Sequence, residues 1–172
     1  MMTKRTALAK RAAIAVVALA VSLAAPASLW ASSKDKGDDE KDRKVKIFER
    51  LELRFGVVAS SYDGGGTVTV TPTGGVTSNG AVLRMGGYTH AAEFTVKGPK
   101  DGTAVITLPS TMTVSNGNST TIVQNFTSQP SGTVVFDHDG KATLKIGATL
   151  IVPAGQPKGE YRGDFTVYAD AP

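Results

Sequence analysis

Two alternating stretches near the C-terminus constrain most strongly what this chain can fold into. In residues 142–152, ATLKIGATLIV, every even position is apolar, and all but one of the odd positions are not. Residues 159–171, GEYRGDFTVYADA, repeat the pattern on odd positions, which include Tyr161, Phe165 and Val167. Successive side chains of a β-strand point to opposite faces, so each stretch predicts a long, half-buried strand.

The N-terminus has the pattern of an export signal. A basic stretch, MMTKRTALAKR, precedes an apolar run over residues 12–25. This run is shorter than the roughly twenty residues that a membrane-spanning helix needs. We therefore predict a signal peptide over residues 1–31, cleaved after Ala27 or Ala31, in preference to a membrane anchor. The prediction implies an exported protein with no membrane span after cleavage.

The basic character of the chain belongs to this signal. Four of the 19 basic residues and none of the 15 acidic residues lie in it, so the mature chain balances 15 basic against 15 acidic residues. A nucleic-acid partner therefore loses its electrostatic support. The chain has no cysteine, which excludes disulfides, thiolate metal sites and a cysteine nucleophile.

The rest of the chain divides into a charged leader and one domain. Residues 32–44 contain mixed charges and cannot bury enough apolar surface to offset their ordering entropy, so we predict a flexible leader. Residues 45–172 have the length of a single domain. Lacking disulfides, this domain must be held together by burial of its aliphatic side chains.

Turn residues divide the domain into about eight or nine strands with no helical period. Residues 45–56 alternate as one first strand that ends at Gly56, and Asp139-Gly140 between two apolar runs predicts a hairpin. This pattern is typical of an immunoglobulin-like antiparallel β-sandwich. The other predicted strands cover residues 67–72, 80–87, 89–98, 103–109, 119–126, 132–138, 142–152 and 159–171, with a short one near 112–114.

Several motifs, in order, resemble one bacterial secreted family. They are LRFG (53–56), GGGTVTVTPTG (64–74), AAEFTVKG (91–98), ITLP (106–109), NFTSQPSGT (125–133) and IGATLIVPAGQPKGEYRGDFTV (146–167). This series resembles the family called domain of unknown function 4402. The resemblance implies an exported β-domain of a Gram-negative bacterium, located in the periplasm, on the outer surface or outside the cell, with no established activity.

The G-x-Y-x-G-x-F-x-V ending is also remotely similar to spore-coat-U-type proteins and to pilin subunits of chaperone–usher systems. In such pilin-like sandwiches the last strand borders a groove that a chaperone, and later a sister subunit, fills with a strand. The alternating apolar residues that match this pattern have the same parity as Gly159, whereas the tyrosine nearest to the C-terminus, Tyr168, has the opposite parity. Residues 33–44 supply no alternating apolar residues for a donor strand. The last strand is therefore either an ordinary sandwich strand or the rim of such a groove, and its assembly residues would be Gly159, Tyr161, Gly163, Phe165, Val167 and Ala169.

No catalytic constellation is recognisable. Only two histidines are present, His90 and His138. Asp137, His138 and Asp139 could gather a divalent ion, but they lack the spaced later ligands of a calcium loop, and we expect a solvated turn. We predict no cofactor.

These observations predict an exported, non-enzymatic structural or surface-assembly protein, a pilin-like subunit among the options. Its partners would be a periplasmic chaperone or sister subunits. The alternative is a self-contained secreted module that binds a carbohydrate or another ligand.

Overall fold

A computed structural model describes residues 44–158 and 160–172 of the chain. The predicted signal peptide and all but the last residue of the predicted leader lie outside these residues, as does Gly159. The described part has no helix, and therefore none long and apolar enough to cross a membrane. It consists of twelve strands: β1 (Lys46–Leu51), β2 (Arg54–Ser60), β3 (Gly66–Val70), β4 (Val76–Gly80), β5 (Val82–His90), β6 (Ala92–Lys97), β7 (Thr103–Thr107), β8 (Thr111–Ser115), β9 (Thr120–Gln129), β10 (Thr133–Val135), β11 (Lys141–Val152) and β12 (Tyr168–Asp170).

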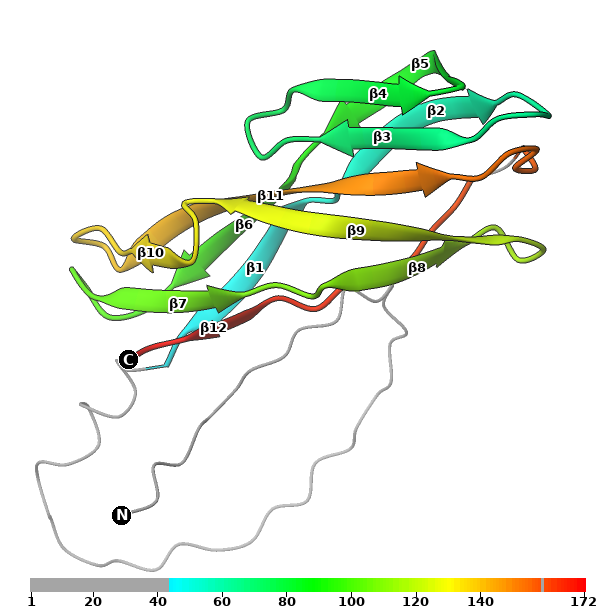
Figure 1. Cartoon of the computed structure of the whole chain (residues 1–172). Coiled ribbons are helices and arrows are strands. Elements are labelled where there is room, and N and C mark those ends of the chain that lie inside the picture. The colour runs from blue at the N-terminus through cyan, green and yellow to red at the C-terminus, as the bar shows by residue number, and fades with distance from the viewer. Residues whose placement is uncertain (1–43, 159) are drawn as a thin grey trace, which may run out of the picture.

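The strands form three antiparallel sheets that are stacked as a sandwich (Figure 1). The largest has seven strands, in the order β1-β6-β11-β3-β4, with β9 also bonded to β11 and β8 bonded to β9. A three-stranded sheet has the order β10-β7-β12, and a two-stranded sheet pairs β2 with β5. The predicted antiparallel β-sandwich is confirmed.

Strand β11, the first of the two predicted C-terminal strands, runs through the whole molecule. One of its edges pairs with β6 over Lys141–Ile146 and then with β3 over Ala148–Val152. Gly147 lies where these two neighbours meet, and a Cβ atom there would lie 2.2 Å from the carbonyl oxygen of Val70. Only glycine allows this close approach of backbone to backbone.

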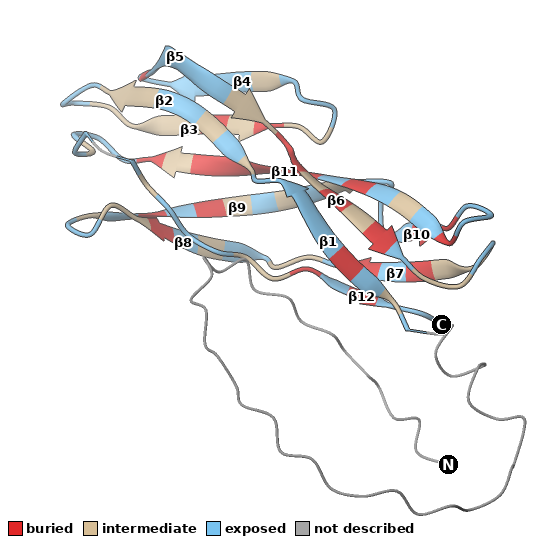
Figure 2. Cartoon of the chain, turned by 180° about the vertical axis from the view of Figure 1, so that it is seen from behind, coloured by how far each residue is buried: buried red, intermediate tan, exposed pale blue. Residues whose placement is uncertain are grey.

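This junction divides the interior into two apolar cores (Figure 2). In the closed half, the sheet β10-β7-β12 covers β6 and the first half of β11 around a core of Ile47, Ala92, Phe94, Val96, Ala104, Ile106, Val134, Phe136, Leu144, Ile146, Val167 and Ala169. In the ribbon half, the pair β2–β5 covers β3 and the second half of β11 around Val68, Val82, Val114, Val123, Ala148, Leu150 and Val152. The even positions of β11 thus supply both cores, as their alternation predicts.

The prediction of one strand over residues 45–56 is wrong. The chain forms β1 and then β2, which pair with β6 and β5 in different sheets. A register shift between Glu49 and Leu51 marks a bulge, and such a bulge breaks the alternation between the two faces. Ile47 is therefore buried, whereas Leu51 is exposed. The predicted ranges comprise nine strands and a short one near 112–114; this division and β4, whose sequence VTSNG shows no apolar alternation, bring the strands of the described residues to twelve.

The predicted Asp139-Gly140 hairpin is also wrong, although the turn itself forms. The Gly140 N–H donates to the Asp137 carbonyl (2.8 Å), and Gly140 has a φ of 71°. However, β10 pairs with β7, and β11 pairs with β6, β3 and β9. Phe136, just before the turn, is buried between the two sheets. The turn therefore links one sheet to the other instead of joining two paired strands.

Candidate assembly site

The C-terminal segment, residues 160–171, runs beside β8 and then beside β7 but pairs with these two strands only near its own two ends. Arg162 exchanges both backbone hydrogen bonds with Ser115 of β8 (2.8 and 2.9 Å), and β12 pairs with β7. The prediction of one continuous strand over residues 159–171 is therefore wrong. Between β7 and β8 the chain crosses from one sheet to the other, and Pro109 there has no N–H to donate to a ladder.

The alternating side chains of this segment nevertheless face the chain's own interior. The Phe165 ring meets Phe94 edge to face with centroids 6.1 Å apart, and it lies 5.2 Å from Phe126. Val167 and Ala169 are buried in the core of the closed half, and Tyr161 packs against the core of the ribbon half. These predicted assembly residues thus fill the domain's own cores.

Gly163 has a different local role. A Cβ atom at this position would lie 2.4 Å from the Thr113 carbonyl oxygen of β8. The glycine therefore lets the C-terminal segment approach β8 directly, next to the bonded pair Arg162 and Ser115.

A groove opens where the pairing of the C-terminal segment is interrupted. Its volume is about 340 Å³. One wall comes from β7, β8 and their connection, and the other from the C-terminal segment. The lining residues are Thr107, Leu108, Pro109, Thr111, Met112, Thr113, Asp164, Phe165, Thr166 and Tyr168. The predicted assembly strand thus forms one wall of this groove.

The last strand lies at the edge of its sheet. Within the described residues, β12 pairs with β7 alone, and β1, at the edge of the facing sheet, pairs with β6 alone. Both views of the fold show β1 and β12 next to each other (Figures 1 and 2). The sandwich thus has an open side. This is the lateral edge of the closed half, and it is bordered by β1 of the seven-stranded sheet and β12 of the three-stranded sheet.

Glu49 marks the β1 border of this open side. Ile47, two residues earlier, points into the core, so the parity of β1 directs Glu49 toward the interior face. Partial burial raises the pKa of the Glu49 carboxyl, and the negative charges of Glu52 and Asp164 raise it further. An inward charge and a bulge are devices by which edge strands resist pairing with other chains.

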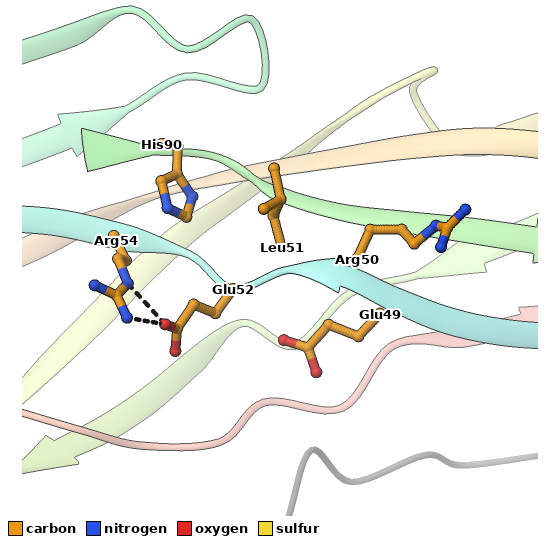
Figure 3. Close-up of a pocket in the computed structure, with 6 residues that line it drawn as sticks. All are labelled: Glu49, Arg50, Leu51, Glu52, Arg54 and His90. Atoms are coloured by element: carbon orange, nitrogen blue, oxygen red, sulfur yellow. Dashed lines mark hydrogen bonds and ion pairs between the residues drawn. The ribbon is translucent and has the colours of Figure 1, made fainter. Parts of the chain in front are cut away.

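A second, more polar depression lies at the junction of β1 and β2 (Figure 3). It has a volume of about 530 Å³ and is lined by Glu49, Arg50, Leu51, Glu52, Arg54 and His90. Arg54 Nε donates to Glu52 Oε1 (2.7 Å), and Arg50 Nε donates to Thr95 Oγ1 (3.2 Å). In Figure 3 Glu52 points toward Arg54, and His90 lies across the depression from Glu49. The arrangement offers hydrogen-bonding groups but no activated nucleophile.

The residues Asp137, His138 and Asp139 do not converge. His138 Nδ1 lies 2.7 Å from Asp101 Oδ1, and Asp137 Oδ1 accepts the backbone N–H groups of Asp139 (2.9 Å) and Lys141 (2.8 Å). In the described part of the chain, no group of three or more His, Cys, Asp or Glu side chains could hold a metal ion. Here the Asp137 carboxylate stabilises the turn, as expected of a solvated Asp-Gly turn.

Sequence reasoning missed the β2–β5 ribbon as a surface. Residues 80–87 predict a strand or hairpin arm, but no local pattern indicates that it pairs with residues 54–60. The exposed apolar side chains Val57, Leu83 and Met85 lie on these two strands. The available signal was the scarcity of charge on both strands, which carry only Arg54 and Arg84.

Comparison with known proteins yields one match. A family model described as a domain of unknown function, DUF4402, matches residues 45–171. No curated protein and no solved structure matches the chain significantly.

Proposed function

The chain belongs to the DUF4402 family, and from this premise we propose that it is an exported, non-enzymatic structural protein that assembles with other protein subunits in the cell envelope. The predicted signal peptide supports export. The observation that carries the proposal is the open side of the sandwich, where, among residues 44–158 and 160–172, β12 and β1 each have a strand neighbour on one side only. A free strand edge offers backbone N–H and C=O groups to an added strand.

The partner in this proposal is a periplasmic chaperone or a sister subunit that inserts an extended segment beside β12. Three residues of β12 supply few backbone hydrogen bonds, so the partner must also contact the groove on the other side of the C-terminal segment, between this segment and β7–β8. Met112 and Phe165 line this groove and would receive apolar side chains of the partner. Of the two strands that border the open side, β1 carries the inward Glu49, which restricts strand addition there, so β12 is the receiving edge in this proposal.

Coexpression tests the proposal. The mature chain, beginning at Ser28 or Ser32, is produced in the periplasm with candidate chaperones and purified by affinity and size-exclusion chromatography. We expect a stoichiometric complex. Thr111→Arg places a long side chain in the groove from an exposed position and should abolish the complex, whereas Thr133→Arg, an exposed threonine of β10, should not. A mature domain that pairs with no chaperone and no sister subunit would contradict the assembly function.

The polar depression at the β1–β2 junction favours a second function, the binding of a small polar ligand such as a glycan. Arg54 and His90 lie on its wall and could donate hydrogen bonds to sugar hydroxyl groups. A glycan array probed with the wild-type domain and with His90→Ala tests this function. Signals that His90→Ala removes would support it, and an array without signals would exclude it.

A further inference from the structure

The β2–β5 ribbon has one face against the core and one face in solvent. Its inner face supplies Val82 to the core of the ribbon half, and Phe55 and Val58 pack against the same core. Because neighbouring side chains of a strand alternate between its two faces, the residues next to Phe55, Val58 and Val82 in the chain point outward. The register of the ribbon shows which of them share the outer face.

Four large uncharged side chains share this outer face. Leu83 pairs with Ala59, and the register shift beside Val57 places both Met85 and Gly86 opposite that residue. Met85 is two residues from Leu83 on the same strand, so their side chains lie on the same face, and Val57 lies on that face because its neighbour Val58 points inward. A second shift places Tyr88 beside Gly56 on the same face. The exposed fractions are 57% for Val57, 68% for Leu83, 65% for Met85 and 81% for Tyr88; we call these four residues the ribbon patch.

The ribbon patch differs from two other exposed apolar sites, at Phe48 and Val105, because its members lie opposite only uncharged residues of the ribbon. On β1, the exposed Phe48 ring lies under Lys97 Nζ, 5.1 Å from its centroid. On the outer face of the three-stranded sheet, Val105 lies opposite Asp170. Residues 55–62 contain no charged residue, and residues 82–90 contain only Arg84, which is exposed but has the parity of Val82, opposite to that of Leu83 and Met85. Depletion of charge together with tyrosine and methionine is the composition of an interface core.

We propose that the ribbon patch is a homotypic interface through which two copies of this chain associate face to face. An uncharged face meets its own copy without like-charge repulsion, so the patch is complementary to itself. A two-fold axis brings the same residues of both copies together, as in most protein dimers. A ribbon of two strands is marginal alone, and a second copy would bury it on both faces.

The same geometry excludes pairing through the ribbon's edges. Both register shifts twist the ribbon, and Gly56, Gly86 and Gly87 have φ values of 75°, 104° and 81°. Bulges of this kind make an edge irregular and oppose strand addition. A membrane surface fits less well, because interfacial faces combine apolar residues with several Lys or Arg to meet anionic headgroups. This inference does not rest on the proposed function, which uses the opposite, open side of the sandwich.

Analytical ultracentrifugation of the purified mature domain, without a chaperone, tests the inference. We expect a concentration-dependent dimer. Leu83→Glu should raise the dissociation constant at least about tenfold, because it places two buried charges in the interface. Val135→Glu is the matched control: this residue of β10 is 66% exposed, close to the 68% of Leu83, but lies outside the ribbon. It should leave the dissociation constant within about twofold, and thermal unfolding should show that both variants fold.

Three outcomes would overturn the inference. One is a wild-type domain that stays monomeric at every concentration at which it is soluble. Another is an equal response of the dimer to Leu83→Glu and Val135→Glu. The third is a monomer that floats with vesicles of anionic phospholipid and loses this binding in Leu83→Glu, which would assign the patch to a membrane. Chaperone binding is scored separately, so a failed coexpression test would remove the proposed function and leave the dimer standing.

Discussion

The closed half and the ribbon half each bury an apolar core, but a different sheet covers each core. In the closed half, three strands cover the core and supply buried side chains such as Ile106, Val134 and Ala169. In the ribbon half, two strands form the cover, and their inner face supplies Val82 with the partly buried Phe55 and Val58. Large apolar side chains on the ribbon's other face stay in solvent.

The difference separates residues that stabilise the fold from residues available for association. Apolar area that is removed from water within the chain contributes to folding at about 25 cal/mol per Å². An apolar side chain of the ribbon patch makes no such contribution to folding, because its area stays in water until another molecule covers it. Single substitutions in the core of the closed half and on the ribbon patch should therefore have effects on the free energy of unfolding that differ several-fold.

The largest effect is expected for Phe136→Ala in the closed half. The Phe136 ring is 2% exposed and lies against Gly98, where an added Cβ atom would come within 2.4 Å of it. Truncating such a ring costs about 3–5 kcal/mol, a large part of the roughly 5–15 kcal/mol that stabilises a domain. Urea unfolding followed by circular dichroism measures the loss. A loss below about 1 kcal/mol would show that the closed half is not the better-packed one.

A smaller effect is expected for Phe165→Ala at the C-terminal segment. This partly buried ring contacts Phe94 and Phe126, so its loss should cost about 2 kcal/mol. The amide groups of the segment should then exchange faster with solvent. Tyr168→Ala, on the opposite parity and 37% exposed, is the control and should cost less than about 1 kcal/mol. Equal losses would mean that the segment does not close the core.

Glu49→Gln should raise the free energy of unfolding by a small, pH-dependent amount, whereas the two phenylalanine variants lower it. The raised pKa of Glu49 means that the folded state disfavours the ionised carboxyl, so the wild-type protein loses stability as the pH rises through that pKa. The variant should gain a few tenths of a kcal/mol at pH 7, because the side chain is largely exposed. The gain should disappear below about pH 4.5, the ordinary pKa of the group. Melting temperatures between pH 4 and pH 8 measure it.

Asp164→Asn is the companion to this variant, because it removes one of the two charges that act on Glu49. It should reproduce part of the gain at pH 7. A gain for Glu49→Gln that is as large at pH 4 as at pH 7 would refute the electrostatic explanation.

The smallest effect is expected for Leu83→Ala on the ribbon patch. Leu83 is 68% exposed, so truncation should change the free energy of unfolding by less than about 0.5 kcal/mol. The measurement is urea unfolding at a protein concentration low enough to keep the chain monomeric. A loss comparable to that of Phe165→Ala would show that the ribbon patch belongs to the fold and not to an interface.

Much of the strand pattern was predictable, because the alternation between the two faces of a strand is a local property. The buried positions of β3, β6 and β11, including Val68, Phe94 and Leu144, follow from it. The C-terminal segment shows the limit of this argument. Its side chains alternate as predicted, but its backbone pairs only at Arg162 and along β12, because its neighbour changes sheets at Pro109.

The sequence by itself determined the all-β class, the inward parity of most strands, the turn at Asp139-Gly140 and the family. Each of these depends on residues that are close together in the chain. Only the tertiary structure decided that residues 45–56 divide between two sheets, that the Asp-Gly turn joins sheets, and that β2 pairs with β5 to expose the ribbon patch. Strand pairing depends on which distant segments compete for the same edge, and a two-residue bulge changes that outcome without leaving a local signal.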